Sequence, residues 1–364
     1  MKKIVLSGYY GFNNAGDEAV LFAIISSLRK IDKKIEITVL SNNPEQTTKL
    51  YDVKAVNRWR LKDIFNALYK SNLLISGGGS LLQDVTSKNG ILYYLGIIFL
   101  AKLLRKPVFI YSQGIGPVNV KRNRMLTGFI LNLTKGITVR DESSKKDLEN
   151  MGLKKPITVS ADPVLSFSPE DVNIEKGEEL LERGDVNINA GKILGISIRP
   201  WKTDEENFKA IAEACDQLIQ KGWQVVFIPM HFPEDIAAAR KVMKQMKENA
   251  FLLKENYTPS ETLSIYKAVD MVIGMRLHSL IMAAVLEKPL AAISYDPKVN
   301  RFMNLLEINE VLDINHLKCH KILDLVQNTW ENRIDFVNNL KEKTTVLRNK
   351  AMIPAEMVAD ILSD

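Results

Sequence analysis

Short apolar runs alternate with segments of helical periodicity along most of this chain. In the first half, the runs that predict β-strands are 3–9, 35–40, 72–76, 107–112, 137–139 and 157–159. The second half repeats the pattern, with predicted strands at 193–198, 224–229, 251–253, 271–273 and 290–294. Helical patterns lie between the strands, at 17–30, 61–70, 91–105, 124–135, 143–151, 205–221, 235–249, 260–268 and 278–287. This alternation predicts mostly parallel sheets wrapped by helices.

The stretch 166–191 interrupts the alternation. It is acidic and holds no long apolar run, so it predicts a linker between domains. A chain of 364 residues is also longer than most single domains. We therefore expect an α/β protein with two Rossmann-like, doubly wound domains, residues 1–165 and 192–340, that face each other across a cleft. Ligands of such sheets bind beyond the carboxyl ends of the strands, where we look for candidate residues.

Composition narrows the class of protein. Apolar residues make up 46% and charged residues 25%, which excludes a disordered, collagen-like or disulfide-stapled chain. Residues 1–165 hold 25 Lys and Arg against 13 Asp and Glu, whereas the remainder holds 24 against 30. A basic half suggests an anionic partner, such as nucleic acid, acidic lipid or a pyrophosphate. No RNA-binding signature or zinc finger accompanies the charge, so we expect no nucleic acid.

The chain is expected to be soluble and cytoplasmic. Its first residues, MKKIVLSGYYG, lack the apolar core of a secretory signal. The longest apolar run, 91–104, includes Lys102 and falls short of the roughly 20 residues of a spanning helix, so it predicts a buried helix. Cys215 and Cys319 form no CxxC pair, which is typical of a reducing compartment and excludes a zinc ribbon.

The loop after the first strand, residues 8–18, carries Asn13, Asn14, Asp17 and Glu18. Its glycines fall at neither dinucleotide-binding nor phosphate-loop spacing, and two carboxylates at a helix start would repel a phosphate. Two interpretations stay open. The polar residues cap the helix, or they bind sugar hydroxyls, with Asp17 as a base.

Glycine-rich loops follow the next two central strands. Gly77–Gly79 and Gln113–Gly116 expose backbone amides that could hold an anion or a closely packed ligand, although tight turns would use the same residues. Arg140 ends a further strand and places a cation at the same edge. It could instead pair locally with Asp141 or Glu142.

Cations also follow the strands of the second half. Arg199 comes directly after one strand, Arg276 and His278 lie between a strand and a helix, and Lys298 follows the last strand. A helix N-terminus with a guanidinium and an imidazole predicts a strong anion site. Because few acids accompany these cations and no DxD pair stands at a strand end, we expect a small polyanion bound by arginines, with no metal and no cofactor.

The other histidines carry weaker signals. His231 follows a strand and could line the cleft. His316 and His320 flank Cys319, but without a fourth ligand they predict a solvated helix face rather than a metal site.

Together these loops resemble the polysaccharide pyruvyl transferase family, most closely its CsaB-type members, which act on bacterial secondary cell-wall polymers. The matching segments lie within residues 7–299, in the family's order: GYYGFNNAGDEAV, ISGGGSLLQD, YSQGIGP, VRDESS, ADP at 161–163, the arginine after GISI, GMRLHSLIMA and ISYDPKV. The resemblance implies a GT-B-like architecture, with residues 341–364 as a C-terminal helix that could cross back to the first domain.

The resemblance also implies an activity: transfer of the pyruvyl group of phosphoenolpyruvate, as a cyclic ketal, to N-acetylmannosamine of an undecaprenyl-diphosphate-linked disaccharide. The implied phosphoenolpyruvate ligands are Arg140, Arg199, Arg276, His278 and Lys298. The implied acceptor ligands are Asn13, Asn14, Asp17, Gly78 and Gln113. Ketal formation needs a proton delivered to the enol, for which His278 is the candidate acid. His278 could instead only bind phosphate.

A lipid-linked acceptor gives the basic half a plausible partner, the anionic inner face of the cell membrane. Trp59 lies between Arg58 and Arg60 in the basic stretch 54–70. This combination suits the lipid interface, but an ordinary basic surface helix would have the same pattern. The alternative functions are a nucleotide-sugar-dependent glycosyltransferase of the same architecture and an anion-sensing or lectin-like binding protein.

Overall fold

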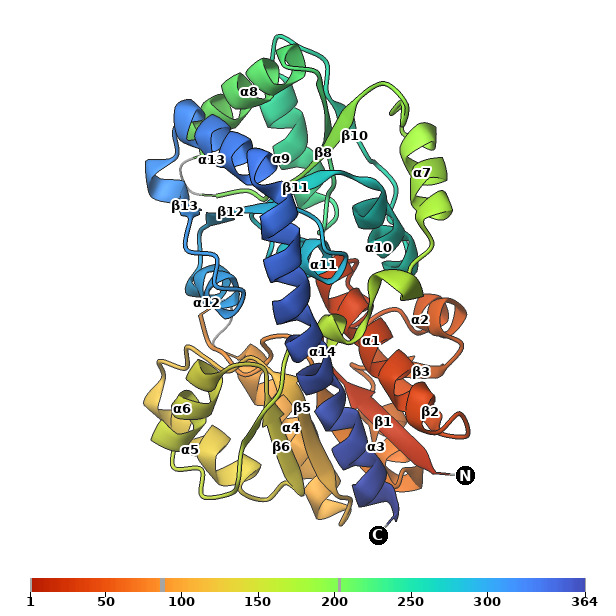
Figure 1. The fold of residues 1–364 in the computed structure, drawn as a ribbon. Coiled ribbons are helices and arrows are strands. Elements are labelled where there is room, and N and C mark those ends of the chain that lie inside the picture. Colours follow the sequence, from red (N-terminus) through yellow and green to blue (C-terminus); the bar gives the residue numbers. More distant parts are fainter. Residues whose placement is uncertain (1, 86–88, 202–203, 364) are drawn as a thin grey trace. The chain divides into compact units, whose positions relative to one another are not determined.

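The computed structural model describes residues 2–85, 89–201 and 204–363, which form two compact units (Figure 1). The first unit consists of Met1–Ser166 and Leu347–Asp364, and the second of Phe167–Val346. Each unit contains one parallel sheet, so the expectation of two doubly wound α/β domains is confirmed.

The first unit has a seven-stranded sheet in the order β3-β2-β1-β4-β5-β6-β7. Its strands are β1 (Lys3–Ser7), β2 (Glu36–Ser41), β3 (Lys54–Asn57), β4 (Leu73–Gly77), β5 (Val108–Gln113), β6 (Gly136–Val139) and β7 (Thr158–Val159). Its helices are α1 (Ala15–Ile31), α2 (Pro44–Tyr51), α3 (Leu61–Lys70), α4 (Gly90–Leu103), α5 (Lys121–Leu131), α6 (Glu142–Asn150) and the short η1 (Pro163–Ser166). Every residue of β4 and β5 is buried, as expected for central strands that helices cover on both faces.

The second unit repeats this arrangement with a six-stranded sheet in the order β10-β9-β8-β11-β12-β13. Its strands are β8 (Lys192–Ser197), β9 (Trp223–Phe227), β10 (Phe251–Leu252), β11 (Met271–Gly274), β12 (Leu290–Ser294) and β13 (Val311–Asp313). Its helices are α7 (Ile174–Arg183), α8 (Asp204–Gln220), α9 (Glu234–Met243), α10 (Pro259–Ala268), α11 (Leu277–Val285), α12 (Pro297–Leu305) and α13 (Cys319–Glu331), with short turns η2 (Pro169–Asp171) and η3 (Ile314–His316).

In both sheets the chain order reverses beside the first strand, between β1 and β4 and between β8 and β11. The loops after the strands at this switch point are where open α/β sheets bind ligands. The fold therefore places the glycine-rich loops of the first unit and the Arg/His loop of the second at positions suited to ligand binding.

Residues 166–191 do not form the expected loop-like linker. They contain helix α7, and an added Cβ at Gly177 would lie 1.9 Å from the backbone oxygen of Ser264 in α10, so the two helices pack closely. Lys267 of α10 donates to the backbone oxygens of Pro169 and Val172, each at 2.7 Å. The sequence pattern does not indicate α7, because its buried Leu180 and Leu181 are flanked by charged residues.

The C-terminal helix α14 (Arg333–Ser363) begins earlier than the expected residue 341. Its residues from Leu347 onward belong to the first unit, where Ile361 lies next to Gly136. Within the parts of the chain that the structure describes, no helix combines the length and the apolar character needed to cross a membrane.

Candidate functional site

In the second unit, the predicted donor residues follow three neighbouring strands. Ser197 of β8 pairs with Gly274 of β11, which pairs with Ala292 of β12, so these strands end at one edge of the sheet. The residues that leave this edge are Arg199 after β8, Arg276 and His278 after β11, and Lys298 after β12. Within this unit, the structure brings four of the five expected phosphoenolpyruvate ligands to the same edge.

Arg199 and Lys298 meet at Tyr295. The Arg199 guanidinium carbon lies 4.5 Å from the centre of the Tyr295 ring, and the Lys298 Nζ lies 5.6 Å from it. Trp201 packs against the same ring, with 5.1 Å between the ring centres. Cation–π attraction thus holds two positive charges beside one aromatic side chain.

Arg276 is fixed by Asp235, a buried residue in the first turn of α9. Its Nε donates to Asp235 Oδ2 at 3.0 Å, and its second terminal nitrogen donates to Asp235 Oδ1. Asp235 Oδ2 also accepts from the backbone nitrogens of Met230 and His231, at 3.1 and 3.0 Å. This two-pronged pairing fixes the direction of the guanidinium and joins the β9–α9 loop to the β11–α11 loop.

His278 lies in the first turn of α11, which begins directly after Arg276. The imidazole is partly buried, and its Nε2 atom is buried. An added Cβ at Gly274 would meet Ser279 Oγ at 2.5 Å, so only glycine lets β11 turn this closely into the helix. The first N–H groups of a helix lack acceptors within the helix, so His278 stands where an anion is favoured.

The expectation that few acids accompany the cations is wrong. Of the four cations expected at strand ends, three have a carboxylate within 4 Å. The pairs are Arg140 with Asp141 and Asp162 at 3.6 Å each, Arg276 with Asp235, and Lys298 with Asp296 at 3.5 Å. Among the described residues, Arg199 forms no ion pair with a carboxylate. The net positive charge at these edges is therefore smaller than the sequence count.

In the first unit, Arg140 lies among the loops that follow β4, β5 and β6. Its terminal nitrogen donates to Ser80 Oγ at 3.1 Å, and a Cβ at Gly114 would lie 2.6 Å from the guanidinium. Gly114 therefore leaves the space that Arg140 occupies. Gln113 is buried beside it, donates to Ser76 Oγ at 2.9 Å, and has an Oε1 with no hydrogen-bond partner among the described residues.

The loop after β1 is held mainly by its own polar side chains. Asn14 caps α1 by accepting from the Gly16 nitrogen at 3.1 Å, while Glu18 accepts from the Gly11 nitrogen at 2.7 Å and from Tyr51 Oη at 2.5 Å. Burial raises the pKa of Glu18 despite these hydrogen bonds. The capping interpretation thus holds for Asn14, and Glu18 supports the loop.

Asp17 faces the glycine loop of β4, because a Cβ at Gly79 would lie 2.9 Å from its Oδ1. Asn13 is exposed and has a left-handed φ of 57°. Gly78 has a φ of +67°, and a Cβ there would lie 1.9 Å from Val20 of α1, so its bare backbone serves close packing.

The remaining candidates have local roles. His231 Nδ1 lies 3.1 Å from Glu234 Oε2. His316 and His320 are exposed, and Cys319 accepts a hydrogen bond from Gln217 at 3.4 Å. In the part of the chain that the structure describes, no group of three or more His, Cys, Asp or Glu side chains could hold a metal ion.

Of the two side chains expected at a lipid interface, Arg58 and Trp59, only one is exposed. Trp59 is exposed, but Arg58 is buried beneath four aromatic rings and donates to the Gly8 backbone oxygen at 2.6 Å. The rings are those of Phe12, Trp59, Tyr93 and Tyr94, with centres 4.5 to 5.5 Å from the guanidinium. Arg58 is therefore a structural cation, and residues 54–57 form strand β3 rather than the start of a surface helix.

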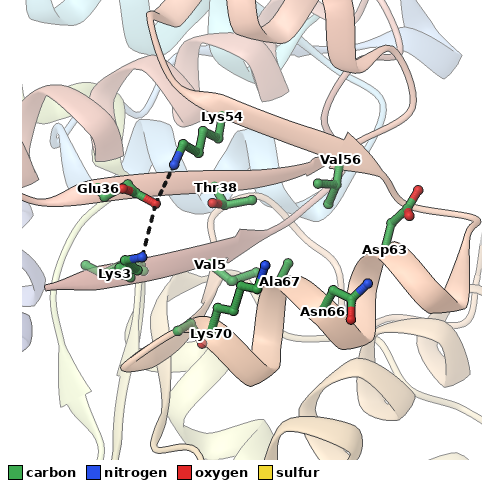
Figure 2. A pocket seen from close by; sticks show the side chains of 12 residues that line it. Lys3, Val5, Glu36, Thr38, Lys54, Val56, Asp63, Asn66, Ala67 and Lys70 are labelled. Atoms are coloured by element: carbon green, nitrogen blue, oxygen red, sulfur yellow. Dashed lines mark hydrogen bonds and ion pairs between the residues drawn. The ribbon is translucent and has the colours of Figure 1, made fainter.

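A surface groove of about 340 Å³ lies elsewhere on the first unit, between the sheet and α3 (Figure 2). Lys3, Glu36 and Lys54 line it from the first residues of β1, β2 and β3, and Asp63, Asn66 and Lys70 line it from α3. None of the expected site residues lines this groove. We assign it no part in the candidate site.

Sequence reasoning missed three residues that shape the sites. Asp235, Tyr295 and Asp162 each contact an expected cation, although Tyr295 and Asp162 lie within the quoted motifs. The sequence pattern that could have pointed to Asp235 is an acidic residue in the first turn of a helix that follows a strand. Its pairing with Arg276, 41 residues away, depends on the geometry of two loops.

Both units have the doubly wound parallel sheet of GT-B-like proteins. Solved structures with this fold include UDP-GlcNAc 2-epimerase from Neisseria meningitidis, with a TM-score of 0.66, 15% identity and coverage of 99% of this chain and 100% of that one. HepE from Anabaena, solved in complex with UDP-glucose, has a TM-score of 0.66 at 10% identity, and both chains are covered completely. At such identities these likenesses show the fold alone.

The family follows from the sequence. The model of the polysaccharide pyruvyl transferase family matches residues 14–297, and the chain belongs to this family. A curated relative, the amylovoran biosynthesis protein AmsJ of Erwinia amylovora, is 22% identical and aligns over 99% of both chains. The resemblance expected from the loop motifs is confirmed, and the chain is a transferase of polysaccharide biosynthesis.

Proposed function

We propose that the protein transfers the pyruvyl group of phosphoenolpyruvate to two hydroxyls of one sugar, as a cyclic ketal, and releases phosphate. The observation that carries the proposal is the set of cations at three neighbouring strand ends of the second unit: Arg199, Arg276 with His278, and Lys298. Family membership and the polysaccharide role in the name of AmsJ support it.

Phosphoenolpyruvate carries a carboxylate and a phosphate, so its ligands must supply several positive charges in fixed directions. Arg276 offers direction, because Asp235 holds its guanidinium from one side. Arg199 offers charge, because only aromatic faces and a backbone oxygen contact it among the described residues. We assign Lys298 to the same donor.

The reaction requires proton transfer at a carbon atom. His278 gives a proton to the methylene carbon, which leaves C2 electrophilic, and the first sugar hydroxyl forms a C–O bond there while its proton passes to Asp17. The bond between C2 and the phosphate oxygen then breaks, and phosphate leaves with both bonding electrons. The second hydroxyl closes the ring and gives its proton to the departing phosphate, and proton exchange with water returns His278 and Asp17 to their starting states. One donor and one diol thus give one ketal and one hydrogen phosphate.

The proposed acceptor is N-acetylmannosamine of a lipid-diphosphate-linked disaccharide that serves a secondary cell-wall polymer. Asn13, Asn14, Asp17 and Gln113 are its proposed contacts. Gly78 has no side chain to offer to the acceptor, so it would only leave space there. The reaction needs no cofactor in this proposal.

The test is release of phosphate from phosphoenolpyruvate in the presence of an aryl-tagged disaccharide. We expect release with the sugar, and much less without it. His278→Gln should retain phosphoenolpyruvate binding by calorimetry but lose turnover about 100-fold or more, as for loss of a general acid. If His278→Gln loses binding instead, the histidine is only a phosphate ligand.

A nucleotide-sugar-dependent glycosyltransferase is the rival function on this fold. Calorimetry with UDP-sugars and with phosphoenolpyruvate separates the two. Tight binding of a UDP-sugar without binding of phosphoenolpyruvate would overturn the proposal. Binding of phosphoenolpyruvate without sugar-dependent phosphate release would indicate an anion-binding protein.

A further inference from the structure

Helices α3, α4 and α5 cover one face of the sheet in the first unit. The chain moves in one direction across the sheet from β3 to β4, β5 and β6, and in the opposite direction from β1 to β2 and β3. Because crossovers between parallel strands are right-handed, α3, α4, α5 and α6 share one face and α1 and α2 share the other. We call the outer surface of α3, α4 and α5 the α3–α5 face.

The α3–α5 face exposes large apolar side chains in rows. They are Leu61, Phe65 and Tyr69 on α3, Phe99 and Leu103 on α4, and Met125 and Phe129 on α5, and each is between 41% and 74% exposed. Within each helix they are four residues apart, so they form a stripe. This stripe is separate from the buried one, which in α3 is formed by Ile64 and Leu68.

A surface helix packs on its sheet through one apolar stripe. A second stripe on each of three adjacent helices is therefore unexplained by the fold. Contiguous exposed apolar surface marks a site of interaction with another molecule or with a membrane.

The charge of the α3–α5 face indicates which kind of partner would bind there. The three helices contain six basic residues, Lys62, Lys70, Lys102, Lys121, Arg122 and Arg124, and one acidic residue, Asp63. Arg105, Lys106 and Lys135 follow closely in the connecting loops. By contrast, α1 and α2 contain three basic and three acidic residues, and their exposed large apolar side chains are Ile31 and Leu50, at 38% and 37%.

We propose that the α3–α5 face docks on the surface of an anionic phospholipid bilayer. Apolar and aromatic side chains would enter the headgroup region, and the surrounding Lys and Arg would lie at the lipid phosphates. A second copy of the chain fits less well, because a two-fold interface would bring two strongly positive surfaces together. The inference stands on this surface and does not depend on the proposed reaction.

The test is co-sedimentation of the full chain with vesicles of phosphatidylglycerol mixed with phosphatidylcholine, compared with phosphatidylcholine alone. We expect binding to the anionic vesicles and weakening by added salt. Each of Lys62→Gln, Lys121→Gln and Arg122→Gln should lower partitioning about fivefold. The double variant Leu103→Glu/Phe129→Glu should abolish binding.

The matched control is Ile31→Glu/Leu50→Glu, which makes the same kind of change on the opposite face and should bind vesicles normally. Circular dichroism and the thermal midpoint should show that both double variants fold. Equal binding to neutral vesicles, or normal binding by Leu103→Glu/Phe129→Glu, would overturn the proposal. So would a dimer that this variant dissociates without any change in lipid binding. The assay uses no substrate, so its failure is distinct from failure of the proposed activity.

Discussion

Arg276 and Arg199 illustrate two ways of holding a cation at a strand end. Asp235 engages Arg276 through two nitrogens, which fixes its position but offsets part of its charge. Arg199 rests on the faces of Tyr295 and Trp201, and among the described residues no carboxylate pairs with it. For the proposed phosphoenolpyruvate donor, the first arrangement suits orientation and the second suits neutralisation of charge.

Replacing Arg276 with lysine tests the value of orientation. Arg276→Lys keeps the charge but cannot reproduce the two-pronged pairing with Asp235, so we expect the KM for phosphoenolpyruvate to rise about tenfold. Initial rates of phosphate release measure this. Arg240→Lys, at an exposed position of α9, is the control and should leave KM unchanged. An unaltered KM in Arg276→Lys would show that position matters less than charge.

The pH dependence of stability tests the buried carboxyl of Glu18. Its pKa in the folded protein is raised above the usual 4.5, because burial disfavours the charged form. The folded state therefore holds the proton more tightly, and stability falls as pH rises from 4.5 through the folded pKa. As pH rises above 4.5, Glu18→Gln should lose less stability than the native protein, as measured by urea midpoints. Parallel pH curves for the two proteins would refute this role.

At the scale of elements, buried strands were predictable and marginal ones were not. Strands β4, β5, β11 and β12 are fully buried apolar runs, which the sequence pattern identifies. Strand β3 reads KAVN and has no buried residue, so the pattern missed it. The predicted helix starts were close for α1 and α11, because polar capping residues or a strand end directly precede them.

The shared edge at which the candidate residues of the second unit lie was predictable, but the partners of these residues were not. Loops after parallel strands had to meet at one edge, which placed Arg199, Arg276 and His278. Arg58 was misassigned to the surface, because its partner Gly8 lies 50 residues away and its aromatic neighbours come from three segments. Burial of a cation by distant aromatic residues leaves no local pattern in the sequence.

The turn after β4 should depend on a glycine at 78. Gly78→Ala places a Cβ against Val20 and requires a left-handed φ, so we expect it to lower the free energy of unfolding by about 3 kcal/mol. The control is Gly96→Ala in α4, where a Cβ meets no atom within 4 Å. It should instead stabilise the protein by about 1 kcal/mol. Urea unfolding of both variants gives the comparison, and equal effects would contradict it.

At the scale of the whole molecule, the second unit is an insertion in the first. The chain leaves the first unit at Ser166 and returns at Leu347, within the single helix α14. The returning segment buries Leu347, Ala351, Ala355, Val358 and Leu362, at helical spacing. The first unit is therefore built from two separate stretches of the chain.

Val358 tests whether this segment stabilises the first unit in particular. Its side chain is fully buried, so Val358→Asp would bury an unpaired charge, and we expect a loss of about 4 kcal/mol. Hydrogen exchange in the full chain should become faster in residues 2–85 and 89–166 and stay nearly unchanged in β8, β11 and β12. Asp360→Asn, two residues away and exposed, should change stability by no more than about 0.5 kcal/mol. Equal acceleration of exchange in both units would mean that the chain unfolds as one cooperative body, because the defect would then reach the strands of the second unit.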